Sequence, residues 1–233
     1  MVYYTGDIHG NILPVQTFIR RFNLTEKDTI VILGDVGLNY YGNNNLVERR
    51  KKYKLNYHGV KILCIHGNHE MRPETMPTYK ESVWNGGTVY VEEQYPNIMF
   101  AKDGEVFNLD GAMSLVIGGA YSVDKFYRLE RGLAWFEDEQ PSEETKARVE
   151  SICSGHNWKI DQVLSHTCPL KYEPTEAFLP GLNQDSIDKS TEIWLDKIES
   201  SLDYKRWLCG HWHIDKKIDK MVFLYKTFEG GME

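Results

Sequence analysis

Short clusters rich in histidine, aspartate, asparagine and glycine recur along the chain. They are Gly6-Asp7-Ile8-His9-Gly10, Gly34-Asp35-Val36-Gly37, Gly67-Asn68-His69-Glu70, Ser165-His166-Thr167 and Gly210-His211-Trp212-His213. Imidazole, carboxylate and amide ligands without cysteine suit manganese, iron or zinc, and not a structural site bound by thiolates. A single Gly-Asp or histidine could be an ordinary turn. Five of the eight histidines lie in these clusters, however, so chance is a poor explanation for the whole pattern.

Two of the clusters contain a pair of ligand residues at positions i and i+2. Asp7 and His9 form one pair, and His211 and His213 form the other. In extended backbone such residues point to the same face, so each pair is expected to bind one metal or two adjacent metals. Paired divalent ions ~3.5–4 Å apart generate a hydroxide nucleophile and stabilise an in-line displacement at phosphorus. Their surplus positive charge would also attract a phosphate.

The elements that position these clusters are expected to be buried parallel strands. In the first third of the chain, strand patterns at Val2–Thr5, Thr29–Leu33 and Val60–Ile65 alternate with helix patterns at Leu13–Phe22 and Leu46–Tyr57. Strands that recur about every 30 residues with helices between them are typical of βαβ units and a parallel sheet. The clusters follow apolar runs, so they should meet at the carboxyl edge, where open α/β sheets bind ligands.

The middle of the chain predicts an antiparallel meander. Short β-rich segments cover Thr88–Val91, Asn97–Ala101, Glu105–Leu109 and Met113–Ile117, and tight hairpin turns are expected at Asp103-Gly104 and Asp110-Gly111. Later elements are expected at Ser142–Ser154 (a helix with Ser142 as N-cap), Ile160–Leu164, Asp188–Ser200 (a helix), Arg206–Leu208 and Met221–Tyr225. No linker or repeat divides the sequence, so residues 1–233 are predicted to form one domain.

Composition excludes several classes of protein. The chain is 41% hydrophobic and 26% charged, as globular proteins are, and its net charge of −7 argues against broad electrostatic binding of nucleic acid. No apolar run reaches the ~18 residues of a membrane span, and the first residues lack the pattern of a secretory signal. The four scattered cysteines are expected to be reduced. We therefore expect a cytoplasmic protein with no membrane association and no obligate protein partner.

The ordered set D-x-H, G-D, G-N-H-E, H and G-H-x-H resembles the calcineurin-like metallophosphoesterase superfamily, in the style of its small bacterial or phage members. The resemblance runs from Asp7 to His213 and implies a mixed α/β, four-layer αββα sandwich with two divalent ions, manganese first and iron or zinc next. It implies one metal bound by Asp7, His9, Asp35 and His213, and a second bound by Asp35 as a bridge with Asn68, His166 and His211.

The same resemblance implies a mechanism. A metal-bridging hydroxide would attack phosphorus, and His69 would act near the leaving group as a general acid or a transition-state stabiliser. The protein-phosphatase branch, however, continues its second motif as G-D-x-x-D-R-G, where this chain has Leu38 and Asn39. Neither residue can orient the histidine or bind phosphate, which disfavours a protein Ser/Thr phosphatase and leaves open what orients His69.

Three arginines are candidates for binding the substrate. Arg72 follows the third cluster, and guanidinium binds phosphate bidentately, although a solvated loop charge is an equal alternative. Arg128 and Arg131 lie in the long segment Ala120–Pro141 beside aromatic residues that could stack a base, or could simply pack the loop onto the sandwich. A second long segment, Thr167–Ser186, is also typical of a binding loop. Trp212 is expected to point into the core.

The sequence thus predicts a dimetal phosphoester hydrolase. Its substrate would be a phosphomonoester or phosphodiester, with a nucleotide or nucleic-acid end preferred because of the aromatic and arginine-rich segment. A protein Ser/Thr-type phosphatase and a dinucleoside polyphosphate hydrolase stay open as alternatives. A non-catalytic binding scaffold is the alternative of another class, but such scaffolds lose motif residues, whereas every ligand position here is filled.

Overall fold

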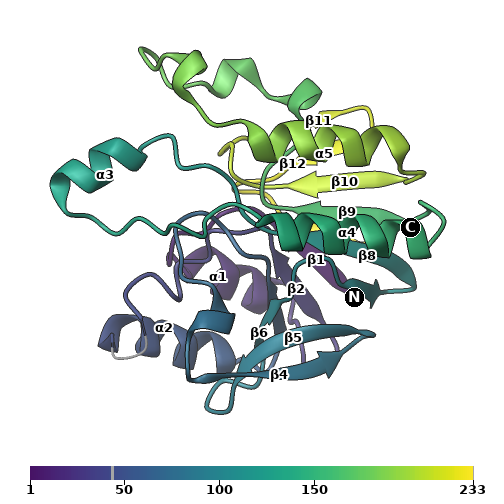
Figure 1. Ribbon diagram of the computed structural model, residues 1–233. Coiled ribbons are helices and arrows are strands. Elements are labelled where there is room, and N and C mark those ends of the chain that lie inside the picture. Colours follow the sequence, from purple (N-terminus) through teal and green to yellow (C-terminus); the bar gives the residue numbers. More distant parts are fainter. Residues whose placement is uncertain (43–44, 233) are drawn as a thin grey trace.

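A computed structural model describes residues 1–42 and 45–232, and in this part of the chain the strands form two mixed sheets that stack face to face (Figure 1). The first sheet has the order β13 (Glu229–Gly230), β1 (Val2–Thr5), β2 (Thr29–Ile32), β3 (Lys61–Cys64), β6 (Ile98–Ala101), β5 (Gly87–Glu92) and β4 (Tyr79–Trp84). The second has the order β11 (Lys216–Ile218), β12 (Met221–Phe223), β10 (Arg206–Cys209), β9 (Gln162–Ser165), β8 (Ala112–Ile117) and β7 (Val106–Leu109).

Helices cover the outer faces of both sheets. Residues alternate along β2: Ile30 and Ile32 pack with helices α1 (Leu13–Arg21) and α2 (Leu46–Asn56), whereas Val31 packs against the second sheet. On the other side, α4 (Glu143–Gly155) and α5 (Ser190–Ser201) pack on the outer face of the second sheet. Strands buried on both faces must be apolar throughout. The predicted mixed α/β class and four-layer αββα arrangement are confirmed (Figure 1).

The parallel strands bring the predicted clusters to one place. In the first sheet β1, β2, β3 and β6 are parallel, and in the second β8, β9, β10 and β12 are parallel. The loops after β1, β2 and β3 carry the first three clusters, and those after β9 and β10 carry the last two. The N–H of Gly210 donates to the carbonyl of His166, which links two of these loops directly.

The first of the two predicted hairpin turns, at Asp103-Gly104, is wrong. Asp103-Gly104 does not close a hairpin, because β6 pairs with β3 in the first sheet while β7 pairs with β8 in the second. Asp103 is buried, accepts from the N–H of Gly118 at 2.6 Å and binds Arg72. This anchored carboxylate holds the chain where it passes from one sheet to the other. The hairpin at Asp110-Gly111 is confirmed.

Several elements were not predicted from the sequence. They are β4, β11, β13, the helix α3 (Lys125–Arg131) and the single-turn helices η1 (Pro73–Thr75), η2 (Leu170–Tyr172), η3 (Thr175–Ala177) and η4 (Gln184–Ser186). Helix α3 lies within the segment expected to be a loop, buries none of its residues and stands away from the sheets (Figure 1). None of the helices in the described part of the chain has the length and apolar character needed to cross a bilayer.

Candidate metal centre

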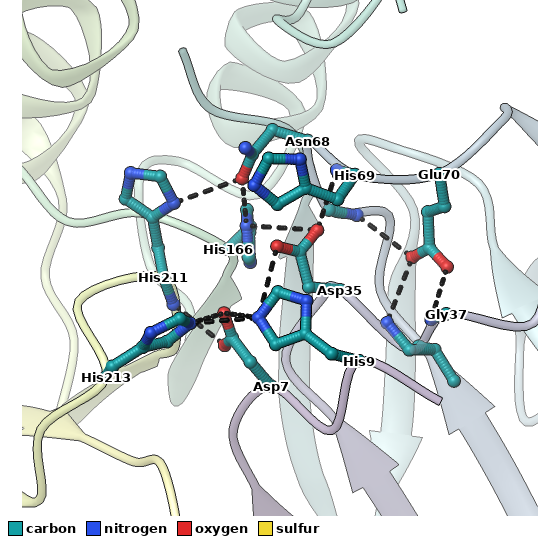
Figure 2. Close-up of polar contacts among 12 residues, drawn as sticks. Asp7, His9, Asp35, Gly37, Asn68, His69, Glu70, His166, His211 and His213 are labelled. Carbon is teal, nitrogen blue, oxygen red and sulfur yellow. Dashed lines mark hydrogen bonds and ion pairs between the residues drawn. The ribbon is translucent and has the colours of Figure 1, made fainter. Parts of the chain in front are cut away.

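The first group of ligand atoms comes from the loops after β1, β2 and β10 (Figure 2). The Nε2 atoms of His9 and His213 lie 3.0 Å apart, and His213 Nε2 is 3.2 Å from Asp7 Oδ2. His9 Nε2 is 3.9 Å from Asp7 Oδ2 and 3.8 Å from Asp35 Oδ2. Two atoms bound to one ion at ~2.0–2.2 Å stand about 3.0–3.5 Å apart. These four side chains therefore fit one divalent ion after shifts of a few tenths of an ångström.

The second group comes from the loops after β2, β3, β9 and β10 (Figure 2). Asn68 Oδ1 lies 2.8 Å from His166 Nε2 and 3.1 Å from His211 Nδ1. His166 Nε2 is also 3.7 Å from Asp35 Oδ1. Since Asp35 places Oδ2 at the first group and Oδ1 at the second, it can bridge two ions. The structure brings together all seven residues that the resemblance assigned to metal binding.

The chemistry of the second group favours a cation. His166 is fully buried, and its Nδ1 lies 2.8 Å from the carbonyl oxygen of Leu33, which fixes the ring proton on Nδ1. Nε2 then presents a lone pair to Asn68 Oδ1. The Asn68 amide is oriented by its N–H2, which donates to Ser122 Oγ at 2.8 Å. His166 Nε2 and Asn68 Oδ1 are therefore two lone-pair atoms only 2.8 Å apart. A cation bound by both would offset their mutual repulsion.

The backbone at the ligands differs from the extended form that was expected. His9, Asp35, His211 and His213 have φ angles of 43°, 44°, 65° and 52°, in the left-handed region. Non-glycine residues adopt this region at a cost that neighbouring contacts must offset. The N–H of His9 donates to the carbonyl of Asp35, and the N–H of His211 donates to Asp7 Oδ1, both at 2.8 Å. The two side chains of each i, i+2 pair therefore converge because of tight turns, and not because extended backbone points them to one face.

Glycines leave room for two of the ligands. A Cβ at Gly34 would lie 2.0 Å from His166 Nδ1, and a Cβ at Gly67 would lie 2.1 Å from Asp35 Oδ1. Both distances are far below van der Waals contact. The glycines of the second and third clusters therefore serve close packing against the metal ligands.

Charge is unevenly distributed among the ligands. Burial works to raise the pKa of Asp7, but the hydrogen bond with His213, the charges of the nearby histidines and the N–H of His211 together lower it to about 2. The same hydrogen bond raises the pKa of His213. Burial lowers the pKa of His211 well below its ordinary value. Carboxylate and neutral imidazole are the forms that bind metals.

Glu70 connects the second and third clusters. Its carboxylate accepts from the N–H of Gly67 and of Gly37 at 3.2 Å each, and from that of Val36 at 3.4 Å (Figure 2). Burial and the neighbouring Asp35 raise the pKa of Glu70 to about 8. No role for Glu70 was predicted from the sequence, yet its carboxylate holds together the two loops that carry Asp35 and Asn68.

His69 borders a cavity beside the two groups. Its backbone N–H donates to Asp35 Oδ1 at 2.8 Å, which fixes the loop that carries the ring. Burial lowers the pKa of His69, while Asp35 raises it and Arg128 lowers it. Asn39 is turned elsewhere, since its Oδ1 accepts from the hydroxyl of Tyr79 at 2.9 Å. Asp35 thus takes part in positioning His69.

The three candidate arginines lie in different surroundings. Arg72 is buried, with Nη1 2.8 Å from Asp103 Oδ2 and Nε donating to the carbonyl of Asp138. Arg128 Nε donates to Asp124 Oδ2 at 2.8 Å, and its charge acts on His69. Arg131 is exposed, 5.5 Å from the centre of the Tyr127 ring. Of the three, Arg128 is the one tied electrostatically to the candidate site.

A cavity of about 430 Å³ opens beside Asp35, Asn68 and His69. Its walls come from the segment before α3, from residues 173–192 and from residues 211–214. The long segments Ala120–Pro141 and Thr167–Ser186, which were expected to be binding loops, both contribute to this lining. Trp212, which was expected to point into the core, packs against the core cluster on the outer face of the second sheet. It is partly buried and also lines the cavity, 5.8 Å from the Phe178 ring.

Comparison with known proteins agrees with this geometry. The family model described as calcineurin-like phosphoesterase matches residues 1–215. A search of the curated proteins finds no match for the chain.

Proposed function

The chain belongs to the calcineurin-like phosphoesterase family, whose members are metal-dependent hydrolases of phosphoesters, and we propose that it hydrolyses a nucleotide or nucleic-acid phosphoester at a centre of two divalent ions. The observation that carries the proposal is Asp35, whose two carboxylate oxygens face two separate groups of nitrogen and oxygen ligands. When bound there, two divalent ions would supply an activated water and neutralise phosphate charge. Manganese suits the mixed histidine and carboxylate set.

The residues around the centre have distinct roles in this proposal. Asp7, His9 and His213 would hold one ion and Asn68, His166 and His211 the other, with Asp35 shared. His69 borders the cavity, and its lowered pKa leaves the ring neutral near pH 7. A neutral imidazole carries one N–H that can hydrogen-bond to the leaving oxygen, and the protonated fraction of the ring can pass a proton to it.

Support for a nucleotide comes from the rings that border the site. Tyr121 and Trp212 line the cavity, and Arg128 lies within electrostatic reach of His69. Aromatic faces stack bases, and guanidinium binds phosphate. We also propose that the protein works in the reducing cytoplasm, since Cys64, Cys153, Cys168 and Cys209 are all buried free thiols.

Asp35→Asn tests the proposal. An amide cannot present two anionic oxygens to two ions, so the variant should bind less than the wild-type complement of manganese. Hydrolysis of p-nitrophenyl phosphate should fall more than about 100-fold, since even changes behind metal ligands cost 10–100-fold. The measurements are elemental analysis after manganese loading and initial rates. Asp203→Asn, at an exposed position, is the matched control. Normal metal content and turnover in Asp35→Asn would refute the bridging role.

A further inference from the structure

The cavity beside the metal centre has a largely apolar wall with paired rings. Phe178 and Trp212 lie with ring centres 5.8 Å apart and planes inclined by 31°. Leu182 and Ile214 extend the same lining. Such a wall favours a planar, apolar face on whatever group enters it, because stacking and burial of ring surface are both favourable.

The charges around this cavity do not suit a chain of phosphates. Asp35, Asp124, Glu173, Asp188 and Glu192 line it, whereas Lys189 is the one lysine or arginine among the described residues that does so. Lys189 is already engaged, because its Nζ donates to Glu173 Oε2 at 2.6 Å and lies 5.0 Å from the Phe178 ring centre. Beyond the metal centre, therefore, the lining offers no free cation for a second phosphate.

Glu192 is one of the acidic residues that line the cavity. This residue, in the first turn of α5, is 4% exposed. Its Oε1 accepts from Thr167 Oγ1 at 2.8 Å, but its Oε2 is buried and has no hydrogen-bond partner among the described residues. A buried acceptor without a donor is costly, and native proteins rarely leave one so. Burial raises the pKa of Glu192 to about 7, although the hydrogen bond from Thr167 and the charge of Lys189 act to lower it.

From these contacts we propose that the cavity binds the leaving group of the substrate as a planar ring with an N–H donor on its edge, which Glu192 Oε2 accepts. This inference rests on the proposed function and narrows it to single-phosphate nucleotides with an amino-bearing base. In the reaction, the P–O bond to the nucleoside breaks, the oxygen of water joins phosphorus, and one proton of that water ends on the nucleoside hydroxyl. The ring stacks on Phe178 and Trp212 while the phosphate lies at the metal centre.

A pair of substrates that differ in one amino group tests the inference. Adenosine monophosphate has the amino group, and purine riboside monophosphate lacks it. With manganese, wild-type kcat/KM should be about 10- to 100-fold higher for the first, since a hydrogen bond to a charged group is worth that factor. Glu192→Ala should reduce this ratio to near one. Glu144→Ala, at an exposed residue in the first turn of α4, should leave it unchanged.

Phe178→Ala provides a second test, which does not depend on whether the Glu192 variant folds. It should raise KM for both purine nucleotides and leave KM for glycerol phosphate unchanged, because glycerol has no ring to stack. Equal turnover of the two purine substrates by the wild type would overturn the inference. So would faster turnover of 5′-phosphorylated oligonucleotides or diadenosine polyphosphates than of mononucleotides.

Calorimetric binding of the nucleosides separates this inference from the proposed function. Adenosine should bind more tightly than purine riboside, and Glu192→Ala should abolish the difference. If adenosine binds in this way but no phosphoester is hydrolysed with manganese, the cavity inference stands and the proposed hydrolysis fails. If aryl phosphates are hydrolysed but the adenosine preference is absent, the hydrolysis stands and the cavity inference fails.

Discussion

At the scale of single residues, the carboxylate of Asp35 has three roles: it faces the first ligand group, faces the second, and positions His69. Asp35 faces both ligand groups and also accepts the backbone N–H of His69. It does so from a left-handed backbone, packed against the bare Cα of Gly67. Its contribution to metal binding and its contribution to the position of His69 therefore cannot be separated by changing Asp35 alone.

The role of His69 can be distinguished from that of the metal ligands, because the effect of substituting it should depend on the leaving group of the substrate. If its ring passes a proton to the leaving oxygen, His69→Ala should lower kcat about 10²- to 10⁴-fold for alkyl phosphates. The loss should be small for p-nitrophenyl phosphate, whose leaving group needs no proton. Initial rates across a series of leaving-group pKa values give the measurement. His156→Ala, at an exposed residue that ends α4, is the control, and an equal loss across the series would exclude proton transfer.

Glu192 should impose a pH dependence on stability. Its pKa is about 7 in the folded protein against 4.5 as an ordinary glutamate, so the folded state retains the proton more strongly. The resulting stabilisation is complete below about pH 4.5 and is lost as the pH rises through about 7. At about 1.4 kcal/mol per pKa unit, the loss is about 3 kcal/mol. Glu192→Gln removes this dependence.

Urea unfolding at several pH values measures the effect as a difference between variant and wild type. Glu192→Gln should gain stability relative to the wild type between pH 5 and pH 8, while Glu144→Gln should show no such trend. A difference that stays constant over this range would mean that Glu192 titrates normally in the folded protein.

At the scale of elements, the parts that could be predicted are those governed by local pattern. The apolar runs that became β1, β2 and β3 are buried on both faces, so each is continuous in the sequence. Ser142 caps α4 as expected, accepting from the N–H of Thr145. Because the clusters directly follow such strands, their convergence could be predicted along with the sheet, whereas the assignment of ligands to two metals came from the family resemblance.

The elements that could not be predicted depend on distant contacts. The turn at Asp103-Gly104 has hairpin chemistry, yet the buried pair that Asp103 forms with Arg72 directs the chain into the other sheet. Helix α3 is an exception: it spans only seven residues and buries none of them, so its sequence is too short for a helical pattern to be distinguished from a loop. Glu192 lies in the first turn of a predicted helix, but the sequence cannot show that its carboxylate is buried beside a cavity.

At the scale of the whole molecule, the two ligand groups join the two sheets. Asp7, His9, Asp35 and Asn68 follow strands of the first sheet, and His166, His211 and His213 follow strands of the second. Ions that bind only the folded form stabilise it by about 2.7 kcal/mol per site at 100 times the dissociation constant. Manganese should therefore raise the melting temperature of the protein, and a chelator should reverse the rise.

Asp35→Asn and Asp203→Asn extend this thermal measurement. The first variant should lose most of the manganese-dependent rise, because its site is shared by both groups, and the second should keep the whole of it. A wild-type melting temperature that does not respond to manganese would argue against a centre that joins the sheets.

The division of the centre between the two sheets also fixes when it can first exist. The loops that hold Asp7, Asp35 and Asn68 emerge early in synthesis, but the last two imidazoles arrive only with residues 211–213. A nascent chain shorter than that lacks one ligand of each group, His213 of the first and His211 of the second. The two groups of ligands therefore cannot both be complete until residue 213 has been synthesised, and a product truncated before it has an incomplete centre.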